Sequence, residues 1–185
     1  MERITSRINS RMPRILYVKD SVRAAVLMPI WQQEDGLCFI LTQRTEQVET
    51  HKGQISFPGG MCEPVDESLV QTALRETHEE IGLHESQINI LGQFDEYLSG
   101  TNLIVTPFIG WVEPPLVLKR NPEEVEKILE VPWKLFRNPR QLKTETRHRF
   151  GRDVTIYHYD FYGLDIWGLT AQIIRDFLRL IDSSC

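Results

Sequence analysis

The chain has 185 residues, of which 41% are hydrophobic and 25% are charged. This composition excludes disordered, collagen-like and disulfide-stapled proteins and predicts a core that needs no structural metal. The 26 acidic residues outnumber the 21 basic ones, which argues against nucleic acid or an anionic membrane as the main partner. The three cysteines form no C-x-x-C pair, which favours a reducing compartment. Because no apolar segment is long enough to cross a bilayer and no secretory signal is present, we expect a soluble, cytoplasmic protein.

Residues 1–21 form a predicted N-terminal extension. Over residues 2–16, apolar side chains recur at steps of four, four and three beside arginines, which is typical of a short amphipathic helix: Ile4, Ile8, Met12 and Ile15. Pro13 disfavours helix near the end of this segment. The Arg-rich, nearly acid-free composition is also typical of a mitochondrial transit peptide. We favour a helix that lies on the domain and leave the second interpretation open.

Residues 22–185 form a single predicted domain. Strand-like patterns occupy residues 22–30, 37–42, 88–97, 103–112 and 154–162. The first two strands flank a polar Asp-Gly turn, which is typical of a hairpin.

Two stretches carry apolar residues at helical spacing. Residues 66–81 form the clearest predicted helix, with Asp66 as its N-cap and Gly82 as its C-cap. A second amphipathic helix is predicted over residues 169–181. Strands that outnumber separated helices predict an α/β (α+β) fold with a mixed sheet flanked by helices.

The helix over residues 66–81 gathers three carboxylates on one face: Glu76, Glu79 and Glu80. Like charges at this spacing destabilise a helix by about 0.2–0.5 kcal/mol per pair, a cost that a bound cation removes. Oxygen ligands without Cys or paired His select Mg²⁺ or Mn²⁺, and Mg²⁺ often also takes phosphate oxygens of its substrate. The Gly59-Gly60 pair just upstream allows the backbone to approach a ligand closely. A solvated acidic helix after an ordinary turn is the alternative.

A wider motif surrounds these glutamates. Glu67, followed after seven residues by Arg75-Glu76-Thr77-His78-Glu79-Glu80-Ile81-Gly82-Leu83, resembles the Nudix box, G-x5-E-x7-R-E-U-x-E-E-x-G-U, in which U is aliphatic. Met61 stands where the box has its first glycine, because the segment from Gly60 to Arg75 is one residue longer, and Thr77 replaces the first aliphatic residue. The extra residue falls in a predicted loop, so the spacing of the glutamates is kept. The resemblance implies a Nudix-type α/β/α sandwich and a Nudix diphosphatase.

A second motif lies upstream of the box. Ile40-Leu41-Thr42-Gln43-Arg44-Thr45, then Gly53 and Phe57-Pro58-Gly59-Gly60, is similar to L-L-T-x-R-[S/A]-x3-R-x3-G-x3-F-P-G-G of the coenzyme A diphosphatase branch. Glu49 stands where that motif has its second arginine, which bears on specificity because an anion replaces a cation beside a polyanionic substrate.

The resemblance implies roles for individual residues. It assigns the metal ligands to Glu76, Glu80, Glu79 and the backbone carbonyl near Gly60, and it makes Arg75 a structural tether between the loop and the helix. The candidate catalytic residues are Glu79, Glu76 and, as an acid on a later loop, Glu124. The candidate substrate contacts are Arg44, Gly59 and Gly60.

Several functions stay open at this point. The first is metal-dependent cleavage of coenzyme A or acyl-coenzyme A to 3′,5′-ADP and 4′-phosphopantetheine or its acyl form. The second is a Nudix hydrolase of ADP-ribose, NADH or dinucleotides, and the third is a catalytically silent nucleotide-binding domain. All three predict a small nucleotide as the partner. Many Nudix proteins are dimers, but no residue pattern here identifies an interface.

Overall fold

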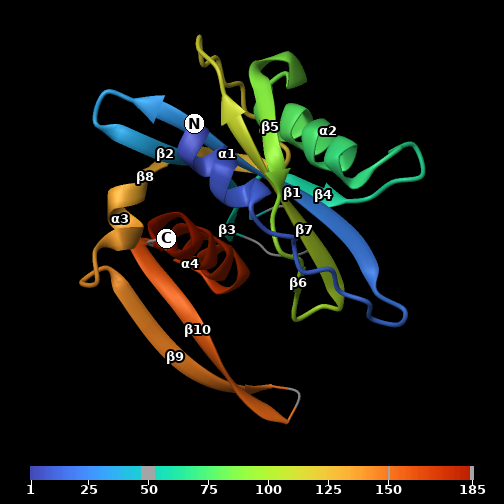
Figure 1. Ribbon diagram of the computed structural model, residues 1–185, viewed down its shortest axis with the longest axis vertical. Coiled ribbons are helices and arrows are strands. Elements are labelled where there is room, and N and C mark those ends of the chain that lie inside the picture. Colours follow the sequence, from blue (N-terminus) through green and yellow to red (C-terminus); the bar gives the residue numbers. More distant parts are fainter. Residues whose placement is uncertain (47–52, 150, 184–185) are drawn as a thin grey trace.

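The computed structural model describes residues 1–46, 53–149 and 151–183. Its larger sheet has the strand order β3-β2-β1-β7-β5, with β4 beside β1, β6 beside β7 and β8 beside β2 (Figure 1). The strands are β1 (Val22–Gln33), β2 (Gly36–Arg44), β3 (Ile55–Ser56), β4 (Gly59–Met61), β5 (Ile88–Gln93), β6 (Tyr97–Leu98), β7 (Leu103–Val112) and β8 (Val125–Pro132). β1 and β7 are parallel, whereas β1 and β2 form an antiparallel hairpin. The predicted mixed sheet and its first hairpin are therefore confirmed.

Helices cover both faces of this sheet, because its strands alternate their apolar side chains between two cores. Ile40 of β2 packs on the face that carries helix α2 (Leu69–Ile81). Its neighbours Phe39 and Leu41 point to the opposite core, which includes helix α4 (Gly168–Asp182). Figure 1 shows α2 on one side of the sheet and α4 on the other. This arrangement confirms the predicted sheet with flanking helices.

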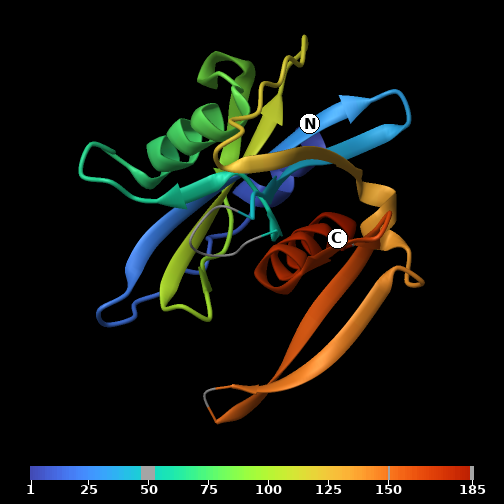
Figure 2. The same ribbon diagram turned by 180° about the vertical axis from the view of Figure 1, so that it is seen from behind.

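A smaller antiparallel sheet follows the main one. It has the order β11-β10-β9 and contains β9 (Leu142–Arg149), β10 (Arg152–Phe161) and β11 (Leu164–Trp167). The hairpin of β9 and β10 projects away from the main sheet (Figure 2). Helix α3 (Trp133–Arg137) connects the two sheets, and a short 3-10 helix (Glu85–Gln87) precedes β5. The sequence patterns predicted β10 and α4 but did not predict β8, α3 or β9.

The N-terminal extension is helical only over α1 (Glu2–Asn9). Ile4 and Ile8 are buried in the core that contains α4, as their spacing predicted, whereas Met12 is 92% exposed. The prediction of a helix over residues 2–16 was therefore wrong for its second half, where Pro13 opposes helix.

The rest of the extension is held by a buried carboxylate. Glu96 accepts a hydrogen bond from the backbone N–H of Leu16 at 2.7 Å and forms an ion pair with Arg23. Thr106 donates to the same carboxylate at 3.1 Å, so its buried charge is well compensated. The division into residues 1–21 and one domain from residue 22 stays a prediction. No helix in the described ranges has both the length and the apolarity needed to cross a bilayer.

Candidate active site at the end of helix α2

Helix α2 is shorter at its start than its apolar pattern predicted. It begins after Ser68, whose side chain accepts a hydrogen bond from the backbone N–H of Gln71, so Ser68 and not Asp66 is the N-cap. It ends at Gly82, which has a φ of 69° and confirms the predicted C-cap. Thr77, where the box motif has an aliphatic residue, is fully buried, and its hydroxyl donates to the Ala73 carbonyl at 2.6 Å. The hydroxyl is therefore satisfied within the helix, and the departure from the motif leaves α2 intact.

Arg75 ties the loop before α2 to the glutamates on the helix. Its Nη1 atom lies 3.0 Å from a carboxylate oxygen of Glu76 and 3.0 Å from one of Glu79. Its Nη2 atom also donates to the Met61 carbonyl at 3.3 Å. The interpretation of Arg75 as a structural tether agrees with these contacts.

The main partner of Arg75 in the loop is Asp66, which the sequence pattern predicted to be the N-cap. Nε and Nη2 of Arg75 contact the two Asp66 carboxylate oxygens at 2.9 and 3.0 Å, a bidentate geometry. Hydrogen bonds from Arg75 hold the pKa of Asp66 well below its usual range. Glu67, aligned with the first glutamate of the box, has an exposed side chain instead. If Gly60 instead of Met61 is taken as the first glycine of the box, the five intervening residues lead to Asp66, so the signal was present in the loop.

Gly60 and Glu76 are in close contact. A Cβ atom on Gly60 would lie 2.5 Å from both Cδ and Oε1 of Glu76, so a larger residue here would force the carboxylate to move. Gly59 has a different constraint, because a Cβ there would lie 2.3 Å from the Ala25 carbonyl oxygen of β1. Gly59 therefore has a packing role, and its contact with substrate stays a prediction.

Replacing Gly60 by alanine is expected to lower kcat/KM by about 10–100-fold, because the methyl group displaces the Glu76 carboxylate and small displacements of site groups have large kinetic costs. Steady-state kinetics across a range of Mg²⁺ concentrations check this. Gly163→Ala, in a turn where the added Cβ meets nothing within 4 Å but φ is +83°, is the control for general backbone strain without displacement of Glu76. Unchanged kinetics in Gly60→Ala would show that this contact is irrelevant to the site.

Glu80 is the most buried acid of the site, with 2% of its surface exposed. Thr42 of β2 donates to one of its carboxylate oxygens at 3.4 Å, and Arg44 Nη1 lies 3.6 Å from the other. Burial raises the pKa of Glu80 to about 8 despite the opposing effect of Arg44. Two further negative charges, on Glu76 and Glu124, add to the rise. The sequence patterns did not single out Thr42, which is fully buried; the available signal was a polar residue at the end of an apolar strand.

Glu76 resembles Glu80 in its electrostatics. Burial is the largest cause of its raised pKa, and the charges of Glu79 and Glu124 act in the same direction. Glu124, at the loop before β8, therefore lies within electrostatic range of both helix acids. Asn121 contacts its carboxylate at 3.5 Å, and the Glu124 carbonyl accepts from the Thr45 N–H at 3.0 Å. The structure thus brings the predicted later-loop acid to the site.

This set of oxygen donors suits a hard divalent cation. Burial raises the pKa of both Glu76 and Glu80, and the positive charges of Arg75 and Arg44 only partly oppose this effect. A cation between these carboxylates would offset that cost. Within the described residues, no three His, Cys, Asp or Glu side chains converge as a formed metal site. Arg75 forms ion pairs with carboxylate oxygens of both Glu76 and Glu79.

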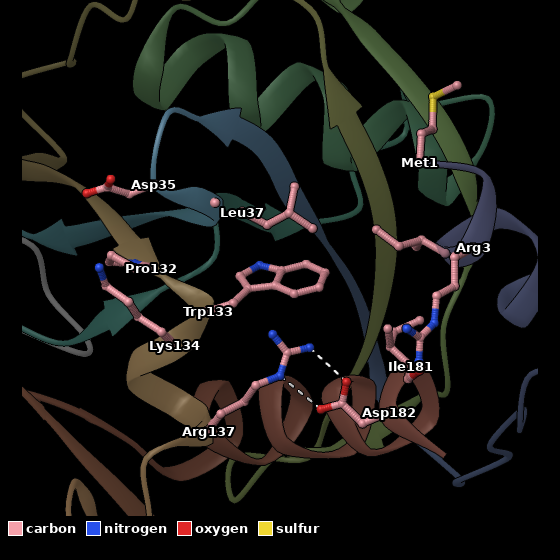
Figure 3. A pocket seen from close by; sticks show the side chains of 12 residues that line it. Met1, Arg3, Asp35, Leu37, Pro132, Trp133, Lys134, Arg137, Ile181 and Asp182 are labelled. Atoms are coloured by element: carbon pink, nitrogen blue, oxygen red, sulfur yellow. Dashed lines mark hydrogen bonds and ion pairs between the residues drawn. The ribbon is translucent and has the colours of Figure 1, made fainter. Parts of the chain in front are cut away.

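A separate hollow of about 300 Å³ lies where α3, the end of α4 and the N-terminus meet (Figure 3). Trp133 lines it, and Arg137 is engaged there by Asp182 through contacts of 2.8 and 2.9 Å. None of the predicted site residues lines this hollow, so we place the site at α2 on chemical grounds.

Comparison with known proteins agrees with this geometry. A family model described as NUDIX domain matches residues 21–154. The chain belongs to the Nudix family. The Nudix hydrolase NudL of Photorhabdus laumondii is 37% identical over 158 residues, which cover 85% of this chain and 84% of that protein. The expected Nudix hydrolase is thereby confirmed.

Solved structures support the Nudix fold. A MutT/nudix family protein from Enterococcus faecalis has a TM-score of 0.57 at 14% identity, covering 99% of this chain and 70% of that one. The NUDIX domain of Shewanella oneidensis NrtR, complexed with ADP ribose, has a TM-score of 0.52 at 18% identity, covering 63% of this chain and 76% of that one. At these identities, the likeness concerns the fold alone.

Proposed function

We propose that this Nudix enzyme cleaves coenzyme A or acyl-coenzyme A at the diphosphate, giving 3′,5′-ADP and 4′-phosphopantetheine or its acyl form. The observation that carries the proposal is the contact between its two sequence motifs. Arg44 of the coenzyme A-type motif lies 3.6 Å from Glu80 of the Nudix box, and Gly60 of the same motif lies against Glu76. A motif that distinguishes one substrate branch thus contributes groups directly beside the acids.

The proposed cofactor is Mg²⁺ or Mn²⁺, with Glu76 and Glu80 as its main ligands. Glu79 and the Gly60 carbonyl are the further proposed ligands. When bound, the ion neutralises charge on the leaving phosphate and lowers the pKa of a water molecule.

The chain itself supplies the remaining chemistry. Arg44 is proposed to contact the diphosphate, since one side of its guanidinium is already turned to the site at Glu80. Glu124 and Glu79 are the proposed acceptors of the proton from the attacking water. Glu79 is half exposed and paired with Arg75, whereas Glu124 is partly buried next to the two helix acids. We therefore assign the general base to Glu124 first.

The test is a hydrolysis screen with Mg²⁺ and with Mn²⁺. Its substrates are coenzyme A, acetyl-coenzyme A, ADP-ribose, NADH and diadenosine polyphosphates, with the products separated and identified. We expect coenzyme A to give 3′,5′-ADP with the highest kcat/KM. Preferential cleavage of another member of this set would change the proposed substrate and leave the proposed type of reaction unchanged.

The second candidate function is cleavage of ADP-ribose, NADH or dinucleotides. The specific observation that favours it is Glu49, where the coenzyme A motif has an arginine. Glu49 lies outside the described residues.

Replacing Glu49 by arginine is expected to raise kcat/KM for coenzyme A about tenfold relative to ADP-ribose, because it replaces repulsion of a polyanion by attraction. Competition between the two substrates in one reaction measures this ratio directly. Glu34→Arg, the same charge change in the β1–β2 turn, is the matched control. An unchanged ratio would remove Glu49 from the specificity contacts.

A further inference from the structure

Two polar atoms at the end of β2 have no partner among the described residues. They are Oε1 of Gln43, an acceptor, and Nε of Arg44, a donor, and both are buried. A buried polar group without a partner costs about 1–3 kcal/mol, so native proteins leave few of them. These two groups lie on adjacent residues, and Arg44 is 3.6 Å from the buried Glu80, so we infer that an external molecule completes them.

The orientation of the Gln43 amide is set by its other end. Nε2 of Gln43 contacts the Gly53 carbonyl oxygen at 3.5 Å. Because a carbonyl accepts hydrogen bonds and cannot donate them, this contact fixes Nε2 toward Gly53 and leaves Oε1 as the free acceptor. What Gln43 lacks is therefore a hydrogen-bond donor.

Gln43 and the catalytic acids lie on opposite faces of the sheet. Gln43 pairs across the strands with Ile55, which belongs to the core that includes α4. Thr42, the residue before it, contacts Glu80 on the α2 face. The pairing of β2 with β8 shifts register between Gln43 and Arg44, which interrupts the ladder at this end of the strand. A ligand that reaches both Arg44 and Gln43 must pass over the end of β2.

We propose that Gln43 is a specificity residue that accepts a hydrogen bond from an O–H or N–H group of the substrate. This group lies a few bonds away from the diphosphate within the substrate molecule. The inference rests on the proposed diphosphatase function. The phosphate oxygens meet Arg44 on the α2 face, and the donor meets Gln43 after the substrate crosses the strand end. Both halves of coenzyme A carry such donors: the hydroxyl and amide groups of the pantetheine arm, and the ribose and adenine groups of the nucleotide.

The experiment replaces Gln43 by methionine, which keeps the length of the side chain and removes the acceptor. Binding of 4′-phosphopantetheine and of 3′,5′-ADP is measured separately by calorimetry in the presence of Mg²⁺. We expect the variant to bind one half about tenfold more weakly and the other half as the wild type does. Its KM for coenzyme A should rise about tenfold, with kcat changed less than threefold. Gln32→Met, the same change at an exposed position in the hairpin, is the control.

The outcomes separate this inference from the proposed function. Suppose that the wild type cleaves coenzyme A and that Gln43→Met binds both halves with normal affinity, or with affinities reduced equally. Gln43 is then not a specificity residue. If the wild type prefers ADP-ribose, the coenzyme A assignment is wrong, and the same calorimetry with AMP and ribose 5-phosphate decides the role of Gln43 by the same criterion. A melting temperature matched to that of the wild type confirms that the variant folds.

Discussion

Replacing Glu80 by glutamine is expected to lower metal-dependent turnover by at least about 100-fold. Mutation of residues that only orient metal ligands already lowers metal affinity or activity by about 10–100-fold. The side chain keeps its size and its place beside Thr42, but it loses the charge that holds a divalent cation. Hydrolysis of the preferred substrate, followed over a range of Mg²⁺ concentrations, measures the loss.

The same variant is expected to fold as stably as the wild type, or more stably, at pH 7. Burial raises the pKa of Glu80 to about 8, so its ionised form is already disfavoured in the metal-free protein. The neutral amide avoids that cost. Thermal unfolding provides a readout independent of activity: Mg²⁺ should raise the melting temperature of the wild type and not that of Glu80→Gln. Glu34→Gln, an exposed change of the same chemistry, should behave as the wild type in both assays. Retained turnover in Glu80→Gln would remove Glu80 from the metal site.

Replacing Asp66 by asparagine is expected to lower the free energy of unfolding by about 2 kcal/mol, the contribution of hydrogen bonds to a charged partner. For a chain of this length that corresponds to a decrease of about 4–8 °C in melting temperature. The bidentate contact with Arg75 is lost, and the Asp66 side chain is only 3% exposed, so water replaces it poorly. Activity should also fall, because Arg75 positions Glu76 and Glu79 while it holds the loop.

The pH dependence of this stability difference follows from the direction of the pKa shift. Arg75 lowers the pKa of Asp66 in the folded state below that of the unfolded chain, so the contribution is fully present above the unfolded pKa of about 4. It is lost progressively as the pH falls below that value. Urea unfolding of both proteins between pH 3 and pH 7 should therefore give a stability difference that is constant near neutral pH and becomes smaller as the pH approaches 3.

Glu67→Gln is the matched control for this experiment. The box alignment gives Glu67 the place of the first glutamate, whereas the structure gives the ion pair to Asp66. If Glu67→Gln loses stability and activity while Asp66→Asn does not, the tether has been assigned to the wrong acid.

Much of the fold was predictable because it is encoded locally. The helical spacing of apolar residues predicted α2 and α4, strand-like apolar segments predicted β1, β2 and β7, and alternation predicted β10. By contrast, β8 has the sequence Val-Glu-Lys-Ile-Leu-Glu-Val-Pro and carries no clear alternation. It is a strand because it pairs with β2 along most of its length. Pairing with a strand that is distant in the sequence cannot be predicted from the residues of the segment alone.

The candidate site divides in the same way. The motif predicted Glu76, Glu79 and Glu80 on one face of a helix, and the spacing alone guarantees this once the helix forms. The motif did not predict Asp66, because one extra residue in the loop obscured which acid reaches Arg75. It also did not single out Thr42 or Gln43, whose roles depend on what their atoms contact and not on their position in a pattern.

The sequence by itself determined the family, the helix that carries the acids and the chemical type of the site, since each depends on residue identity at fixed short spacing. Only the tertiary structure decided which acid pairs with Arg75, that Thr42 and Arg44 contact Glu80 from 38 and 36 residues away, and that burial raises the pKa of Glu80. The contacts with Glu80 arise where β2 lies beside α2, whereas the Asp66–Arg75 pair arises where the loop before α2 folds back on the helix. Contacts between distant segments, and the removal of water from the groups between them, exist only once the whole sheet has formed.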